Sequence, residues 1–174
     1  MRKELITLLI LLSAFMVIGC AGYDFGDETT VVDGADVDAI QISGADLYVQ
    51  LTEEDNYKEW ELWPGVDEMS DGKGPHGGFI TVYVSEDALA AIENKEGVMP
   101  NGSIIVKDGF KSNGEPFETV VMYKVDGYNP GNNDWFWAAY SPEGEVEVEG
   151  KVGFCISCHA RDADNDYLRV ADIG

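Results

Sequence analysis

The stretch Phe79-Ile80-Thr81-Val82-Tyr83-Val84 decides the fold class, because an unbroken run of β-branched and aromatic side chains favours a β-strand. A turn rich in glycine and proline precedes it at residues 71–78. Ser85 follows as a candidate helix N-cap, and Leu89 and Ile92 then stand at helical spacing. The fold is therefore expected to combine strands with at least one short helix.

Further short strands are predicted on the C-terminal side, separated by clusters of Gly, Asn and Pro. They are expected at residues 103–107, 117–125 and 134–140, with a more exposed strand at 145–149. Residues 55–60 are expected to form a short helix over the sheet. Together these elements predict an α+β fold, mainly an antiparallel β-sheet with a few short helices, in a single domain.

The motif Cys155-Ile156-Ser157-Cys158-His159 carries the strongest chemical signal of the chain. Two cysteines separated by two residues and followed at once by histidine are the pattern of c-type haem attachment. The thiols become thioethers to the haem ring, and the adjacent histidine falls beneath the iron as its proximal ligand. A Cys-x-x-Cys pair also occurs in thiol–disulfide switches and in zinc sites, which are the alternatives. We predict one covalent haem c.

The N-terminus has the pattern of an export signal. Arg2 and Lys3 precede an apolar run at residues 5–18, which is shorter than the ~20 residues that a membrane span needs. The run ends in Val17-Ile18-Gly19-Cys20, which resembles the bacterial lipoprotein cleavage box. Residues 1–19 are therefore expected to be a signal peptide, and Cys20 the lipidated first residue that anchors the mature chain to a membrane. An ordinary signal peptide or an uncleaved anchor is the alternative, and every version places the protein in the bacterial periplasm or cell envelope.

The formal net charge of −22 limits the choice of partners. A surface this acidic argues against nucleic acid, whose phosphates require basic patches. It favours a basic partner protein or a small neutral or cationic substrate, although solubility alone also explains most of the charge. Residues 20–45 are rich in Asp, Gly and Thr and are expected to form an acidic, flexible tether. The haem domain is then expected at residues 46–174.

Several segments before the haem motif follow one another in a familiar order, at residues 56–60, 71–73, 81–84, 100–107 and 134–140. This order, completed by the Cys155–His159 motif, resembles the cytochrome P-460 family over roughly residues 46–171. The resemblance implies a largely antiparallel β subunit that tends to form a homodimer. It also implies one of two functions. Cytochrome P-460 proper oxidises hydroxylamine and passes the electrons to another carrier, whereas the cytochrome c′-β type binds nitric oxide without turnover.

The same resemblance assigns a role to Lys107. In cytochrome P-460 proper a lysine at the end of a Val-x-Val-Lys strand is bonded to the porphyrin ring, and Lys107 ends the matching run 104–107. The alternative is an ordinary strand-end lysine in solvent. Asp108 is a candidate proton acceptor or a turn residue before Gly109. Phe79 and Phe110 are candidates for the apolar lining of the distal side of the haem, although aromatic strand residues are more often core.

The sixth position of the iron is expected to be open. His76 lies in a glycine-rich loop, where it is either a sixth ligand, a distal proton donor or a loop residue with no axial role. Met69, Met99 and Met122 are candidate thioether ligands by residue type alone. An open iron predicts binding of a small nitrogen-oxide ligand or substrate, whereas a sixth protein ligand predicts a periplasmic electron carrier.

Overall fold

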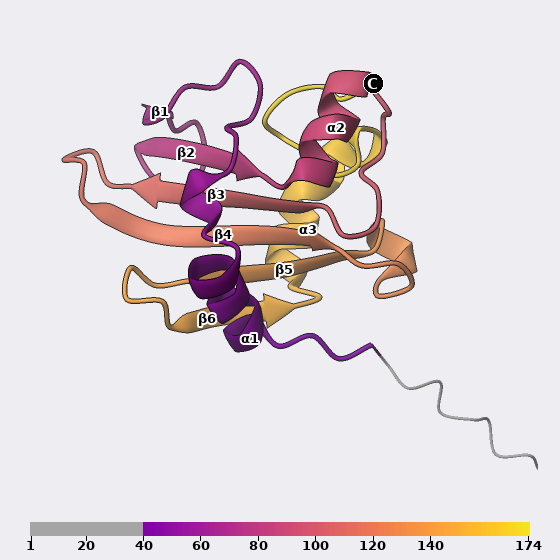
Figure 1. Cartoon of the computed structure of the whole chain (residues 1–174), viewed down its shortest axis with the longest axis horizontal. Coiled ribbons are helices and arrows are strands. Elements are labelled where there is room, and N and C mark those ends of the chain that lie inside the picture. Colours follow the sequence, from indigo (N-terminus) through magenta and orange to yellow (C-terminus); the bar gives the residue numbers. More distant parts are fainter. Residues whose placement is uncertain (1–39) are drawn as a thin grey trace, which may run out of the picture. The chain divides into compact units, whose positions relative to one another are not determined.

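A computed structural model of the chain describes residues 40–174 (Figure 1). The expected signal peptide at 1–19, Cys20 and most of the tether at 20–45 lie outside the described residues. Within the described part, the first helix begins at Gly44, so the domain starts slightly before the predicted boundary at Asp46. No helix between residues 40 and 174 has the length and apolar character needed to cross a membrane.

The sheet confirms the predicted fold class. It has six strands in the order β1-β2-β3-β4-β5-β6, and every neighbouring pair is antiparallel. The spatial order of the strands equals their order along the chain, so each connection joins the end of one strand to the start of its neighbour. The strands are β1 Ser70–Asp71, β2 Phe79–Val84, β3 Ile104–Phe110, β4 Pro116–Lys124, β5 Trp135–Tyr140 and β6 Val146–Gly150.

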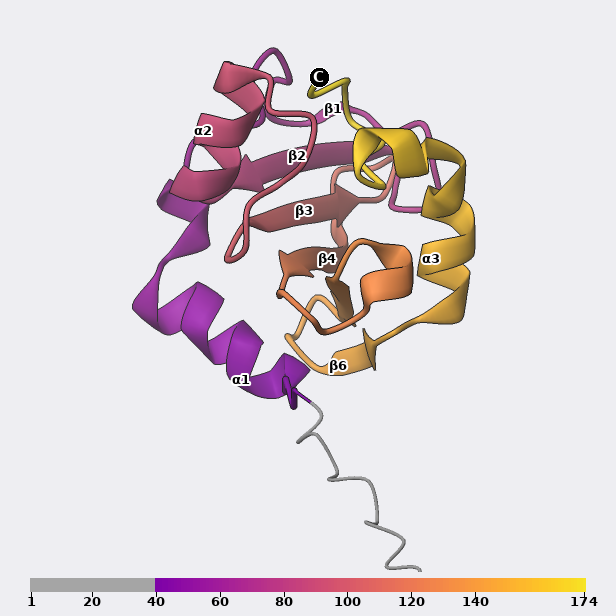
Figure 2. The ribbon, with the colours of Figure 1, turned by 90° about the vertical axis from the view of Figure 1, so that its right-hand side faces the viewer.

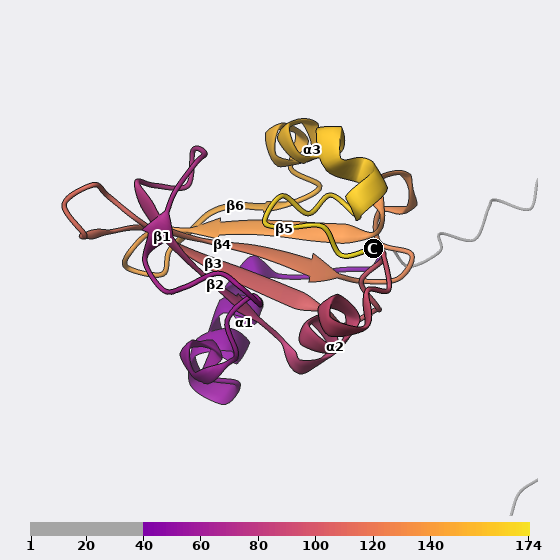
Figure 3. The ribbon, with the colours of Figure 1, turned by 90° about the horizontal axis from the view of Figure 1, so that it is seen from above.

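The helices are short and lie around this sheet. Figures 2 and 3 show α1 and α3 on opposite sides of it. The α-helices are α1 Gly44–Val49, α2 Glu86–Asn94 and α3 Gly153–His159. A π-helical turn η1 (Gln50–Glu54) continues α1, and three 3₁₀ segments complete the set: η2 Tyr57–Glu59, η3 Pro130–Asn132 and η4 Ala160–Asn165.

Each face of the sheet has its own hydrophobic core. On the side of α3, here called the α3 face, the core includes Val82, Ile105, Met122 and Trp137, and Cys155 packs against it. The opposite side, here called the α1 face, is built from a second set that includes Tyr83, Val106, Val121, Phe136 and Tyr140, together with Leu47 of α1. Neighbouring residues of one strand therefore belong to different cores, as the period of two along a strand requires.

Strand β3 departs from its predicted length. It was expected to end at Lys107, but it continues to Phe110. The backbone of Lys107 pairs with Val82 on one side and Val120 on the other, so Lys107 is an interior strand residue. The turn expected at Asp108 is wrong, because these residues extend the ladder to an irregularity between Gly109 and Phe110.

The helices were predicted less completely than the strands. α2 begins as expected after Ser85, although the Ser85 hydroxyl accepts a bond from the Ile104 amide (3.0 Å) instead of capping the helix. The helix expected at 55–60 is only the single turn η2. Two helices were not predicted: α1, which crosses the expected boundary between tether and domain, and α3, which contains the haem motif.

Candidate haem-binding site

Helix α3 places the three residues of the haem motif together. Cys155, Cys158 and His159 stand at positions i, i+3 and i+4, which lie on one face of an α-helix. The helix packs Cys155 and Ile156 against the core of the α3 face. His159 is consequently buried, with 8% of its surface exposed. The sequence motif becomes a spatial cluster because the segment is helical.

The surroundings of His159 fix the orientation and the protonation state of its ring. Its Nδ1–H donates to the carbonyl oxygen of Tyr167 at 2.7 Å, and its ring stands edge-to-face on Trp137 with centroids 4.8 Å apart. Burial lowers the pKa of His159 to about 4, against a smaller opposing contribution from the Tyr167 carbonyl. The imidazole is therefore neutral at pH 7, and with the proton on Nδ1 its lone pair is on Nε2, as metal ligation requires.

The two cysteines are free thiols. Burial, followed by the charge of Glu118, raises the pKa of Cys155 to about 11. Thiol–disulfide switches use a cysteine of lowered pKa, so the environment of Cys155 disfavours that alternative. Among residues 40–174 no group of three or more His, Cys, Asp or Glu side chains is placed to hold a metal ion, which leaves the pair without further zinc ligands there.

Two adjoining cavities of about 290 and 200 Å³ lie next to this cluster. The first extends under the loop at residues 65–77, and the second extends between α3 and strands β3 to β5. The residues that line both are Pro75, His76, Lys107, His159, Arg169 and Val170. The structure therefore brings His159, Lys107 and His76, which are far apart in sequence, to one place.

Lys107 reaches this place from the middle of β3. Its side chain is half-buried and makes no hydrogen bond or ion pair within residues 40–174. Burial lowers its pKa, the charge of Arg169 lowers it further, and Glu118 opposes the change. A lysine that is partly desolvated and makes no direct ion pair gives up its proton more readily, and the neutral amine is the form that can make a covalent bond.

His76 forms a pair with Glu118 at the same cavities. Its Nδ1–H donates to the Glu118 carboxylate at 2.7 Å, and both side chains are largely buried. The loop that carries His76 lies directly on β3, because Gly109 has no side chain. A Cβ at Gly109 would meet the His76 carbonyl oxygen, and the Gly78 amide donates to the Phe110 carbonyl at 2.7 Å.

Glu118 and Arg169 are the site residues that sequence reasoning missed. Glu118 precedes Val120 and Met122 by the strand period of two, so the predicted strand at 117–125 already contained the information that these three share a face. Arg169 donates from Nη1 to the sulfur of Cys158 (3.0 Å) and from Nε to Asp162 (3.0 Å). Nothing in the local sequence indicates that contact.

Three residues expected at the site lie elsewhere. Asp108 points to the α1 face, where the hydroxyls of Tyr57 (2.9 Å) and Thr119 (2.8 Å) donate to its carboxylate. It is therefore separated by the sheet from Lys107, and its expected role as the proton acceptor is wrong for this arrangement. Phe79 and Phe110 also line neither cavity, and Phe110 borders a separate cavity of about 320 Å³ beside Asp108. Ile80 lines the site in their place.

The three methionines have different positions. Met122 lines the smaller cavity. Met99 is buried in the core and donates its backbone amide to Asp166, and Met69 is exposed and borders neither cavity. Only Met122 among them is therefore near the haem motif.

The residues present fit a covalently bound haem. The donor set has two free thiols and a neutral, oriented imidazole on one helix, next to the smaller cavity, whose walls are mainly apolar. Trp137 lines the smaller cavity, and within the described chain its indole Nε1–H is buried without a hydrogen-bond partner. A buried donor of this kind normally has a partner, which a bound group in the cavity can provide.

Two free thiols and a buried imidazole in a Cys-x-x-Cys-His helix form the attachment site of a c-type haem protein. The cytochrome P460 family model matches residues 54–169, which is more than half of the chain. The chain belongs to the cytochrome P460 family, and the family implies a haem cofactor. A comparison with curated proteins gave no match.

Proposed function

We propose that this protein is an exported monohaem cytochrome c that oxidises hydroxylamine. Cys155 and Cys158 would hold the haem covalently and His159 would ligate its iron, which would leave the iron a binding position for the substrate. The observation that carries the proposal is the convergence of Lys107 and the His76–Glu118 pair on the two cavities that His159 lines.

The haem, when bound, supplies the one-electron redox chemistry. The protein supplies proton transfer and positioning. Oxidation of hydroxylamine releases protons together with electrons, so a nearby base accelerates it. His76 can take up a proton at Nε2, and the Glu118 carboxylate that accepts its Nδ1–H stabilises the imidazolium that forms. Lys107 lines both cavities, and in this proposal its neutral amine would bond to the porphyrin edge in place of a ring hydrogen.

The released electrons need an acceptor. The net charge of −22 favours a redox partner with a basic docking surface. Anchoring through lipidated Cys20 would hold the domain at the membrane of the bacterial envelope, where such a partner is reached by lateral diffusion.

A second candidate function is a six-coordinate electron carrier, and one observation favours it. Glu118 holds Nδ1 of His76, which leaves Nε2 of His76 with its lone pair at a cavity that His159 also lines. A carboxylate-oriented histidine is a common metal ligand. The two functions differ in the spin state of the iron, since two axial histidines give a low-spin haem.

The test is hydroxylamine-dependent reduction of an artificial electron acceptor by protein matured in the periplasm. Glu118→Gln should lower the rate by ~100-fold or more, which is the usual contribution of a positioned base. Glu115→Gln is the matched control, because Glu115 lies in the same β3–β4 hairpin but is exposed to solvent. The control should keep the wild-type rate.

Each other outcome points to a different function. A high-spin wild-type protein that binds nitric oxide but does not turn over hydroxylamine is a gas binder of the c′-β type. A low-spin spectrum that His76→Ala converts to high-spin identifies the electron carrier. Equal rates in Glu118→Gln and Glu115→Gln would remove Glu118 from the mechanism.

A further inference from the structure

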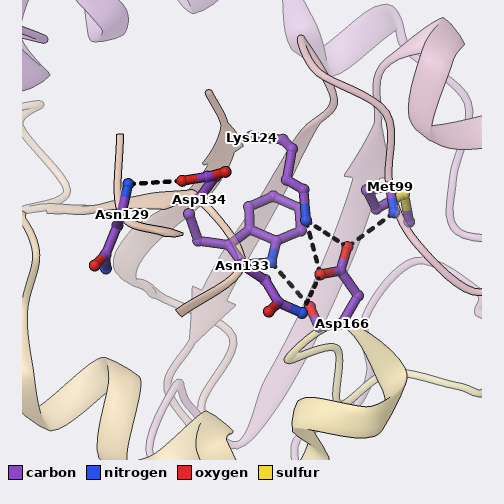
Figure 4. A network of polar contacts seen from close by, with 7 residues as sticks. Met99, Lys124, Asn129, Asn133, Asp134 and Asp166 are labelled. Atoms are coloured by element: carbon purple, nitrogen blue, oxygen red, sulfur yellow. Dashed lines mark hydrogen bonds and ion pairs between the residues drawn. The ribbon is translucent and has the colours of Figure 1, made fainter. Parts of the chain in front are cut away.

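A buried ion pair lies beside the haem-binding site and outside the two cavities that carry the proposed function. Lys124, at the end of β4, contacts both carboxylate oxygens of Asp166 at 2.7 and 2.9 Å (Figure 4). Asp166 is 1% exposed and Lys124 is 5% exposed. Both charges are therefore removed from water, which is unfavourable unless each is fully hydrogen-bonded.

The carboxylate of Asp166 is fully hydrogen-bonded. In addition to Lys124, the backbone amide of Met99 donates to it at 2.8 Å and the side-chain amide of Asn133 donates at 2.9 Å (Figure 4). Buried ion pairs contribute little to stability compared with apolar residues of the same size, and their best-supported role is to fix one arrangement among several. This pair joins β4, the segment before β3 and the C-terminal segment at one point.

The point that it fixes is next to the carbonyl that orients His159. Asp166 and Tyr167 both have left-handed backbones, with φ of 51° and 66°, which is uncommon for residues other than glycine. The peptide between them is held at both ends, since the indole N–H of Trp135 donates to the Asp166 carbonyl (2.9 Å) and the Tyr167 amide donates to Asp162 (2.9 Å). The Tyr167 carbonyl then accepts the Nδ1–H of His159 at 2.7 Å.

We propose that the Lys124–Asp166 pair is a positioning device for the axial histidine. It holds the left-handed turn that presents the Tyr167 carbonyl to His159, and that hydrogen bond fixes the tautomer and the direction of the ring. The bond also increases the electron density on the imidazole, which stabilises ferric over ferrous iron. The inference rests on the proposed role of His159 as the haem ligand.

The experiment compares three variants of the haem-loaded protein. Lys124→Met/Asp166→Asn removes both charges together, so that no unpaired charge stays buried, and asparagine tolerates the left-handed backbone. Asn133→Ala removes one donor to Asp166, and it also places alanine on a left-handed backbone (φ 52°) that asparagine tolerates better. Asp108→Asn is the matched control, because it converts a buried carboxylate into an amide on the opposite face of the sheet.

The measurements are the iron–histidine stretching frequency of the ferrous protein and the reduction potential. The double variant should lower the frequency and raise the potential, Asn133→Ala should do so by less, and the control should change neither. Thermal unfolding of each variant separates this effect from lost stability. Should Asn133→Ala and every folded form of the double variant match the wild type and the control in both measurements, the pair is only structural and the inference fails.

Failure of the proposed haem ligation gives a different result. If His159→Gly leaves the wild-type haem spectrum unchanged, His159 is not the ligand and the proposed function falls with this inference. If His159→Gly changes the spectrum while the pair variants do not, the positioning role alone is wrong.

Discussion

Lys107 and Asp108 are neighbours in β3, yet they serve opposite faces of the sheet. On the α3 face Lys107 has no hydrogen bond or ion pair within residues 40–174 and lines the two cavities beside His159. On the α1 face the carboxylate of Asp108 has two hydroxyl donors and lies 3.7 Å from the ammonium of Lys58. Strand β3 therefore carries an amine without a hydrogen-bond partner in the described chain and, at the next residue, a carboxylate whose hydrogen bonds are all made within the fold.

This difference extends to the whole of each face. Tyr57 and Tyr83 pack edge-to-face on the α1 face with centroids 5.4 Å apart, and the Tyr140 hydroxyl donates to the Gly44 carbonyl at 2.8 Å. The hydroxyls of Tyr57 and Tyr140 have their partners within the protein. The α3 face instead leaves Lys107 and the indole N–H of Trp137 without partners in the described chain. Changes on the α3 face should thus alter haem properties, and changes on the α1 face should alter stability.

The largest effect is expected from removing the two cysteines on the α3 face. Cys155→Ala/Cys158→Ala should abolish covalent haem attachment, because both thioethers are lost. Mass spectrometry of protein matured in the periplasm should show one haem on the wild type and none on the variant. Haem that leaves the wild-type protein in acidified organic solvent would contradict the covalent site.

The next effect tests Lys107 directly. If its amine is bonded to the porphyrin, a tryptic digest of the wild type should yield a peptide containing Lys107 joined through haem to the peptide containing Cys155–His159. Lys107→Ala should restore an ordinary c-type ferrous spectrum and eliminate hydroxylamine oxidation. If the wild-type digest shows no cross-link, Lys107→Ala should change the free energy of unfolding by less than about 1 kcal/mol, because Lys107 makes no ion pair within the described chain.

Lys111→Ala is the control for that experiment. Lys111 lies just beyond β3 and is exposed, with Glu115 as its partner at 3.4 Å. Its removal should change neither the spectrum nor the rate. An unmodified Lys107 in the wild-type digest would favour the nitric-oxide-binding type over the hydroxylamine oxidase.

The fold was largely predictable because its signals are local. The run at Phe79–Val84 and the aromatic strand Trp135–Tyr140 are read from residue type and period, and both lie where expected. The extension of β3 to Phe110 was not predictable, because Asp108 and Gly109 look like a turn in sequence. Gly109 is instead explained by the loop carrying His76, which approaches too closely for a side chain.

Only the part of the candidate site that lies on helix α3 was predictable from the sequence. Cys155, Cys158 and His159 are close in sequence and remain close in space. Glu118 comes together with His76 through the register of β3 and β4, which a single sequence does not specify. Phe79, Phe110 and Asp108 were assigned to the wrong face of the sheet. Successive side chains of a strand point to opposite faces, and nothing in the local sequence shows which of the two faces binds the haem.

A smaller effect is expected on the α1 face. Asp108→Asn should lower the free energy of unfolding by about 1–3 kcal/mol, because the amide cannot accept all the bonds that the buried carboxylate accepts. The haem spectrum and the ligand-binding properties should stay unchanged, since the sheet separates Asp108 from the cavities. Denaturant unfolding and the absorption spectrum check the two halves of this prediction. A changed spectrum with unchanged stability would reverse the assignment of the faces.

The smallest effect is a dependence of stability on alkaline pH that also belongs to the α1 face. Burial, followed by the charge of Glu149, raises the pKa of Tyr140 above its ordinary value of 10.0. Above pH 10 the unfolded chain therefore loses the Tyr140 proton while the folded chain keeps it, so that stability falls as pH rises. The loss is about 1.4 kcal/mol for each pH unit, until the raised pKa is reached.

Tyr140→Phe removes this contribution, although it also removes the hydrogen bond to Gly44 at every pH. The variant should consequently be less stable than the wild type at pH 8, and the gap should narrow between pH 10 and 11. Parallel curves of unfolding free energy against pH for the two proteins would show that Tyr140 titrates normally.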